Sequence, residues 1–326
     1  MERKRFVTGI LSAVGICVLI LDGQTAIQGC RAGLSLCAET VIPSLFPFFW
    51  LNGLLNGALL GYDMGITDRL GALFGYPKGC ASIMISSLLG GYPSGAQAVG
   101  QCCKNGKLSN ESGELLLSVS NNAGPAFLFG MAGQMFPDRR TAWVLWFVQI
   151  VSSVFVAQIL LPKFEKPLLS SSDPYGQRYT IEHSIQAILR VCGWIVLFRG
   201  GMEILRKRLL NNISDVFYTL IAGFLEISNG CFLLSSVEDI RIRFILCTLF
   251  LAFGGLCVTM QTVSVVEGLN MRYYFIGKAM QTGYAVLLAC ILAFRAWVVG
   301  AVVIFLYILA VIKKKKYYSN LSRVRV

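Results

Sequence analysis

Long apolar windows dominate the pattern of this chain, and each has the length of a membrane-crossing helix. The windows at 142–161 and 244–266 contain no charged residue, and those at 279–294 and 296–312 are separated by Arg295 alone. A helix needs about 20 predominantly apolar residues to cross roughly 30 Å of hydrocarbon. The pattern therefore predicts an all-α, polytopic transmembrane protein with about eight long apolar segments.

Earlier in the chain the apolar pattern is interrupted. A first helix is expected at about 6–22, followed by a longer segment at 33–61 that Pro43 and Pro47 should break, because proline removes a backbone hydrogen bond and kinks a helix. The region 70–101 is rich in glycine and proline yet nearly uncharged. Such backbone is tolerated at membrane depth only where protein or a wet cavity satisfies it. We therefore expect a re-entrant hairpin there.

The chain divides at one long polar stretch. This division predicts an N-terminal membrane half (1–162), a linker (163–183), a C-terminal membrane half (184–312) and a basic cytoplasmic tail (313–326). A short echo links the halves, since Gly90-Gly91 with Gln97 aligns on Gly254-Gly255 with Gln261. Internal repetition is typical of transporters. We therefore expect two weakly related repeats, for which an inverted arrangement is one option.

Composition and charge agree with a membrane protein. The chain has 55% hydrophobic and only 14% charged residues, and its net charge is +12. The basic residues cluster at the ends of apolar windows, which is the pattern of topology-setting flanks rather than of nucleic-acid binding. Both termini are therefore expected in the cytoplasm. A signal peptide is the alternative for the first window, but the site around Ala26 is poor for cleavage and further spans follow, so we expect a retained helix.

Signatures of enzymes are largely missing from the sequence. The eleven cysteines form no CxxC pair, and many sit in apolar windows, where they are interpreted as small buried hydrophobes. The single histidine, His183, falls in the predicted linker, and no P-loop or GxSxG motif is present. The sequence thus predicts no enzyme activity, no cofactor and no metal site.

The candidate chemistry lies where the apolar segments are broken. Asn121 and Asn122 need partners, because an unmatched amide in hydrocarbon costs several kcal/mol. Nearby glycine and proline would unwind the helix and expose N–H groups that can hold an anion. The alternative is a kinked helix whose asparagines bond to neighbouring helices. The predicted substrate contacts are Gly91, Tyr92, Ser94, Gly95, Gln97, Ser120, Asn121, Asn122, Gly124, Gly254, Gly255 and Gln261.

Two charged residues inside apolar segments are candidates for coupling. Glu226 is a candidate proton or cation site, or a counter-ion to a basic side chain; the alternative is a carboxylate at a helix end in the interface. Lys278 and Lys78 are its candidate basic partners, and Lys278 is also placed to snorkel. The coupling ion is expected to be H+ or Na+. The other expected partners are a small anionic solute and the lipid bilayer, while a homo-oligomer stays open.

Several motifs together resemble one family. They are Pro43-Ser-Leu-Phe-Pro47, Gly91-Tyr-Pro-Ser-Gly95 with Gln97, Ser120-Asn-Asn-Ala-Gly-Pro125, Gly223-Phe-Leu-Glu226 with Gly230, and Phe253-Gly-Gly255 with Gln261. In this order they resemble the YlbJ-type (SpoVV) sporulation integral membrane proteins of the nucleoside-recognition, or Gate-domain, superfamily. Gate domains in related nucleoside carriers pair re-entrant hairpins with unwound helices around a central solute.

The resemblance implies a function as well as a fold. It implies a Firmicute endospore former, a place in the outer forespore membrane, and a role in moving dipicolinate towards the developing spore. Dipicolinate is a planar dianion, which half-helix N-termini with amide and hydroxyl donors would suit. A nucleoside-type carrier and a non-transporting scaffold for spore envelope or cortex assembly are the alternatives. Scaffolds usually present a sizeable soluble domain, and the long polar stretch here has only about twenty residues.

Overall fold

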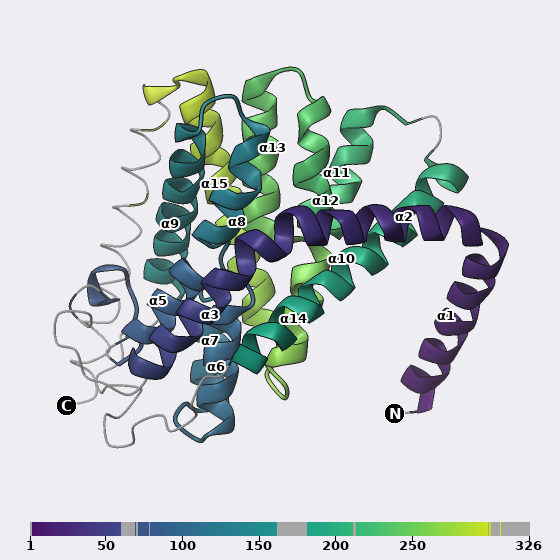
Figure 1. Cartoon of the computed structure of the whole chain (residues 1–326). Coiled ribbons are helices and arrows are strands. Elements are labelled where there is room, and N and C mark those ends of the chain that lie inside the picture. The colour runs from purple at the N-terminus through teal and green to yellow at the C-terminus, as the bar shows by residue number, and fades with distance from the viewer. Residues whose placement is uncertain are drawn as a thin grey trace.

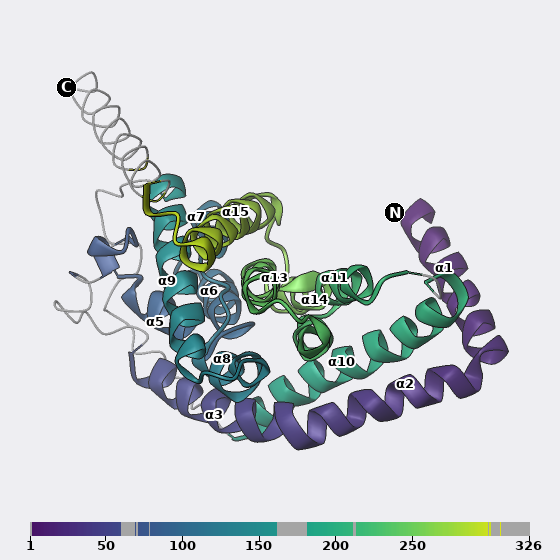
Figure 2. The same cartoon turned by 90° about the horizontal axis from the view of Figure 1, so that it is seen from above.

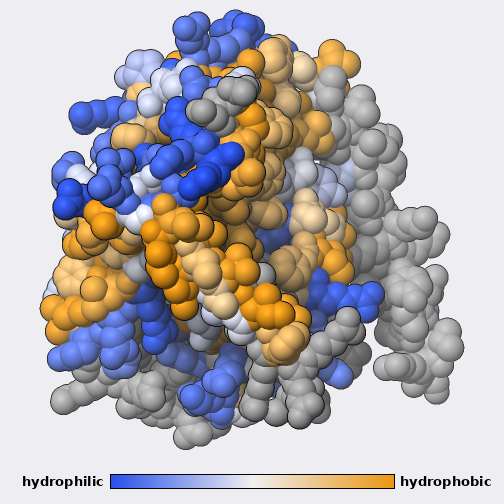
Figure 3. Space-filling view, turned by 90° about the vertical axis from the view of Figure 1, so that its right-hand side faces the viewer, coloured by the Kyte–Doolittle hydropathy of each residue, from blue (hydrophilic) through white to orange (hydrophobic). Residues whose placement is uncertain are grey.

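The computed structural model describes residues 2–59, 69, 71–77, 79–161, 181–210, 213–298, 300 and 307. Lys78, most of the predicted linker, most of the last apolar window and the basic tail lie outside these residues. The described residues form helices and no strand, and four of their helices are long and apolar enough to cross a membrane. On the face drawn in Figure 3, hydrophobic residues gather between hydrophilic residues above and below. The chain is thus an all-α integral membrane protein, as predicted.

The N-terminal region consists of helices that lead from the periphery of the molecule towards its centre. Helix α1 (Glu2–Leu21) extends away from the rest of the chain, and α2 (Gly23–Leu36) runs beside α10 (Figures 1 and 2). A π-helical turn, Cys37–Val41, joins α2 to α3 (Ile42–Leu59).

The predicted break at Pro43 and Pro47 is wrong. Both prolines lie in α3, and the helix continues through them. Pro43 cannot donate to the carbonyl four residues earlier, and the π-helical turn lies where that bond would be missing. The wider turn therefore absorbs the proline without ending the helix.

The first half contains a helical hairpin and a broken helix. Helices α5 (Ala81–Gly90) and α6 (Ser94–Lys104) pack against each other across a three-residue turn, so a helical hairpin is present, while its re-entrant placement in the membrane stays a prediction. Each is too short to cross a bilayer alone. Next come α7 (Asn110–Leu117), the unwound segment 118–124 and α8 (Pro125–Gly130). A 3-10 turn, Ala132–Met135, leads into the uninterrupted α9 (Arg140–Leu160).

The second half contains the same kinds of element in the same order. A long helix, α10 (Ile181–Leu209), precedes a hairpin of α11 (Asp215–Leu225) and α12 (Ile227–Leu233), which is extended by the 3-10 turn Leu234–Ser236. A broken helix follows, made of α13 (Ile240–Phe253) and α14 (Gly255–Val265), and then the uninterrupted α15 (Arg272–Phe294). Because α10 begins at Ile181, His183 lies on this helix rather than in the linker.

The two Gly-Gly pairs that align in the sequence do not lie at equivalent positions in the structure. Gly90 and Gly91 lie at the turn of a hairpin, whereas Gly254 and Gly255 lie at the break between α13 and α14. The two Gly-Gly pairs therefore occupy different kinds of element. A repeat relating the two halves stays a prediction.

Candidate functional site

Breaks in four elements meet near the centre of the molecule. A Cβ added at Gly91, in the first hairpin turn, would lie 2.7 Å from the backbone nitrogen of Gly124, at the end of the unwound segment. A Cβ at Gly254, between α13 and α14, would lie 3.7 Å from the Tyr92 ring. Glu226, in the second hairpin turn, lines the same cavity as Gly91. The sequence predicted the breaks at Gly91 and in the segment 120–125, and the tertiary structure brings them together with the breaks at Glu226 and Gly254.

The cavity at this meeting point, here called the central cavity, has a volume of about 30 Å³. Its lining is mostly apolar, with Glu226, Ser228 and Gln261 as the polar side chains. A volume of this size holds one or two waters and no ring-shaped solute. The described conformation is therefore closed around its centre. The lining residues are Leu45, Phe49, Gly90, Gly91, Tyr92, Gly124, Ala126, Phe127, Val191, Glu226, Ile227, Ser228, Val258 and Gln261.

Glu226 is buried in the break between α11 and α12. Its side chain is only 1% exposed, and its two carboxylate oxygens accept hydrogen bonds from the backbone N–H groups of Ser228 (2.9 Å) and Asn229 (2.7 Å). These contacts cap the N-terminus of α12, where the helix dipole favours a negative charge. The N-terminus of this half-helix is thus occupied by a carboxylate of the chain itself.

The two asparagines of the unwound segment bond to other elements. Asn121 Nδ2 donates to Thr262 Oγ1 on α14 at 2.8 Å, and Asn122 Nδ2 donates to Ser87 Oγ on α5 at 2.7 Å. Asn122 Oδ1 accepts from Gln281 Nε2 on α15 at 2.6 Å. In this closed structure both side chains therefore form hydrogen bonds to neighbouring helices, which was the alternative to contact with a solute. Contact with a solute stays a prediction for another state.

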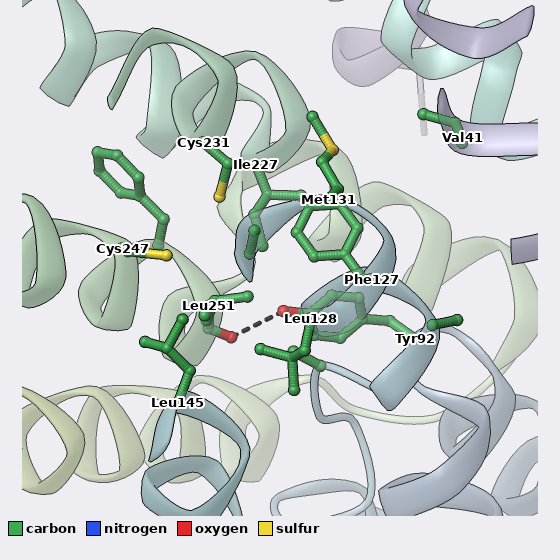
Figure 4. Close-up of a cluster of buried hydrophobic side chains, with 14 of the residues drawn as sticks. Val41, Tyr92, Phe127, Leu128, Met131, Leu145, Ile227, Cys231, Cys247 and Leu251 are labelled. Carbon is green, nitrogen blue, oxygen red and sulfur yellow. Dashed lines mark hydrogen bonds between the residues drawn. The ribbon is translucent and has the colours of Figure 1, made fainter. Parts of the chain in front are cut away.

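Tyr92 connects the first hairpin to the second broken helix. Its hydroxyl donates to the carbonyl oxygen of Leu251 at 2.7 Å, and apolar side chains of α8, α12 and α13 surround this contact (Figure 4). The last carbonyls of a helix lack helical partners. Tyr92 thus supplies a donor near the C-terminal end of α13. The Tyr92 ring lines the central cavity, while its hydroxyl is already bonded.

Lys278 supplies a second donor at the same helix end. It lies on α15, is 3% exposed, and does not snorkel to the surface. Its ammonium donates to the Ala252 carbonyl oxygen at 3.1 Å, to Gln281 Oε1 at 3.4 Å and to the Asn121 carbonyl oxygen. Lys278 therefore bonds to the broken ends of both discontinuous helices. It does not pair with Glu226, and Lys78 lies outside the described residues.

A second cavity, here called the amide-lined cavity, adjoins the central one. It has a volume of about 50 Å³ and shares Val191 and Gln261 with the central cavity. Gln97 also lines it, so the two glutamines that the sequence singled out face one space. His183 and Arg190 are exposed, which places this cavity towards the surface. Its full lining is Pro93, Gln97, His183, Gln186, Ala187, Arg190, Val191, Gln261, Ser264 and Val265.

The remaining predicted residues pack the breaks together. A Cβ at Gly95 would overlap the Ser120 carbonyl oxygen, so this glycine lets α6 approach the unwound segment. Ser94 lies beside Gly90 in the first hairpin turn. Gly255 lies against the last carbonyl oxygens of α11, with Gly223 O 3.2 Å from an added Cβ. These residues hold backbone in place and do not line either cavity.

Sequence reasoning missed two polar residues. Gln281 forms hydrogen bonds with both Asn122 and Lys278. The sequence feature that could have identified it is its position one helical turn after a lysine, beside an otherwise apolar stretch. Arg199 Nη1 donates to Asn229 Oδ1 at 3.3 Å and Nη2 pairs with Glu203 at 3.7 Å. Arg199 thus contacts the side chain of Asn229, whose backbone N–H donates to Glu226. Its signal was a charge inside the apolar part of α10.

Comparison with known proteins gives one informative similarity. The chain is 24% identical over 330 aligned positions to the sporulation integral membrane protein YlbJ of Bacillus subtilis (strain 168), covering 86% of this chain and 81% of that protein. This similarity confirms the resemblance that the motifs predicted. No family model and no solved structure matches the chain, and the place in the Gate-domain superfamily stays a prediction.

Proposed function

From its relationship to the YlbJ-type sporulation integral membrane proteins, we propose that this protein moves a small organic anion across a bacterial membrane during sporulation. Dipicolinate is the solute that we propose first, and the outer forespore membrane is the membrane. Transport in this setting requires a chain that crosses the bilayer and has a polar site at its centre. The four long apolar helices supply the first condition.

The observation that carries the proposal is the meeting of four backbone breaks around a closed cavity. Discontinuous helices and hairpins whose broken ends meet are the usual way in which secondary transporters build a site near the middle of the bilayer. Gly91, Gly124 and Glu226 line that cavity from three of the broken elements. Broken backbone is costly in hydrocarbon, so its concentration at one point supports a function at that point.

The charges around the two cavities support proton coupling at Glu226. An anion in the central cavity would face the Glu226 carboxylate at short range, and like charges repel strongly where water is excluded. A proton on Glu226 removes that repulsion. We therefore expect the anion and a proton to enter the centre together.

The amide-lined cavity supports a route for the solute. Arg190 brings a positive charge to this cavity, and Gln97 and Gln261 bring amide groups. Because Gln261 and Val191 line both cavities, a solute held beside Arg190 needs only a local opening to reach the centre.

Uptake into proteoliposomes tests the proposal. Purified wild-type protein should take up labelled dipicolinate under an imposed pH gradient, and Asn122→Ala and Glu226→Gln should reduce that uptake at least tenfold. Glu226→Gln should also remove the dependence on the pH gradient. Glu111→Gln, which changes an exposed carboxylate on α7, is the matched control and should transport normally.

The same assay separates the alternatives. Uptake of nucleosides without dipicolinate would favour a nucleoside-type carrier. Uptake of neither solute under any ion gradient would refute transport and favour a scaffold for spore envelope or cortex assembly. Unchanged pH dependence in Glu226→Gln would refute proton coupling at this residue while leaving transport intact.

A further inference from the structure

The acceptors around Lys278 have the composition of a site for a free monovalent cation. The ammonium contacts three neutral oxygens: the carbonyls of Asn121 and Ala252 and the side-chain oxygen of Gln281. The Tyr92 ring lies with its centroid 5.4 Å from Nζ. None of the ion pairs between described residues includes Lys278. The positive charge is thus surrounded by dipoles and a ring rather than by a carboxylate.

The broken helices explain why these oxygens point inward. Asn121 lies in the unwound segment between α7 and α8, where its carbonyl is not committed to a helix. Ala252 lies two residues before Gly254, which ends α13 with a φ of +85°. Carbonyls at the C-terminal end of a helix carry the negative end of its dipole. In secondary transporters, unwound carbonyls and half-helix C-terminal ends of this kind coordinate Na+.

We propose that the Lys278 ammonium is a tethered substitute for a coupling Na+, filling a cation site that the two broken helices form. The side chain enters from α15 and joins the unwound segment of the first half to the end of α13 in the second half. A bound Na+ would join the same two breaks but could leave. The covalent cation keeps them joined at any Na+ concentration.

Two consequences follow from a filled cation site, and the second distinguishes it from an ordinary buried lysine. The wild-type protein should gain no stability from Na+, because the site is already filled. Shortening the side chain to alanine should vacate a space lined by carbonyl oxygens, which Na+ or methylammonium can then enter. A lysine that merely packs against its neighbours would leave a space without affinity for cations.

Thermal unfolding in detergent tests both consequences. Wild type and Lys278→Ala are melted in choline chloride, sodium chloride and methylammonium chloride at equal ionic strength. The melting temperature (Tm) of wild type should be the same in all three salts. The Tm of Lys278→Ala should be lower in choline and should rise with Na+ or methylammonium, by several degrees (on the order of 3 °C) at tenfold excess over the dissociation constant.

Two further variants serve as controls. Lys278→Met keeps an unbranched side chain only one heavy atom shorter and removes the charge, so it should be destabilised in every salt and rescued by none. Lys104→Ala changes an exposed lysine on α6 and should behave as wild type. A rise in wild-type Tm with Na+ would overturn the proposal, as would a Lys278→Met variant as stable as wild type. If Lys278→Ala does not fold, a rise in wild-type Tm with Na+ or a Lys278→Met variant as stable as wild type still overturns the proposal.

The transport consequence rests on the proposed function. Dipicolinate uptake by wild type should be unchanged when choline replaces Na+ on both sides of the membrane, and uptake that requires Na+ would overturn the proposal. The melting experiments need no transported solute. A protein that moves neither solute would therefore refute the proposed function while the melts still test the cation site.

Discussion

The hydrogen bond from Tyr92 to Leu251 allows a specific prediction about the closed state. Tyr92→Phe removes one oxygen and keeps the ring in the first hairpin turn. The lost contact is a 2.7 Å bond to the Leu251 carbonyl, at the usual length for a hydroxyl donor. Both residues are buried, with Tyr92 9% exposed and Leu251 0% exposed. The variant thus isolates one bond between the two halves.

The expected magnitude follows from the burial of the acceptor. A net hydrogen bond contributes about 0.5–1.5 kcal/mol, whereas a buried acceptor left without a partner costs about 1–3 kcal/mol. The Leu251 carbonyl has no access to water, so the larger range applies. We expect Tyr92→Phe to lower the free energy of unfolding by about 1–3 kcal/mol, which is roughly a 5- to 150-fold change in the equilibrium constant.

Equilibrium unfolding in mixed detergent micelles, followed by tryptophan fluorescence, measures this change. Tyr273→Phe is the matched control, because it removes the same hydroxyl from a tyrosine that is 39% exposed. The control should unfold within about 0.5 kcal/mol of wild type. A Tyr92→Phe variant that unfolds like the control would show that the hydroxyl does not stabilise the end of α13.

Two further predictions concern packing and acid stability. Gly95→Ala should destabilise the protein by about 1–3 kcal/mol through overlap with the Ser120 carbonyl, whereas Gly193→Ala, which meets no atom within 4 Å, should be neutral or stabilising in the same unfolding assay. The Arg208 guanidinium and a neighbouring lysine lower the pKa of Asp22. The stabilisation from this carboxylate is therefore present at neutral pH and lost as pH falls through the lowered pKa, below about 4. Asp22→Asn should melt below wild type at pH 7, the difference should shrink only as the pH falls below the ordinary range of an aspartate and through the lowered pKa, and a constant difference would contradict this.

The hairpin turn at Gly91 could be predicted from sequence because its causes are local. Glycine and proline clustered in one stretch disfavour a continuous helix there, and apolar neighbours place the interruption at membrane depth. The same reasoning was wrong at Pro43 and Pro47, where a π-helical turn allowed the helix to continue. Whether a proline breaks a helix or is absorbed depends on the packing of the helix, which no local pattern contains.

The partners of the buried polar groups could not be predicted. The cost of desolvating an amide implied that Asn122 would be hydrogen-bonded. It did not indicate that the donor to its side-chain oxygen would be Gln281, 159 residues away. Likewise the sequence offered Glu226 and Lys278 as partners, and the structure gives each a different set of contacts. Such pairings follow from how helices cross, because many donors could satisfy the same acceptor.

The sequence by itself therefore determined the membrane class, the positions of the two first-half backbone breaks and the need to satisfy their polar groups, since apolar length and backbone chemistry act locally. Only the tertiary structure decided which breaks meet, that they close around a cavity of about 30 Å³, and that the Lys278 ammonium bridges two of them. The physical reason is that hydrophobic transfer fixes which segments enter the bilayer, whereas hydrogen-bond geometry between distant helices fixes what they form there.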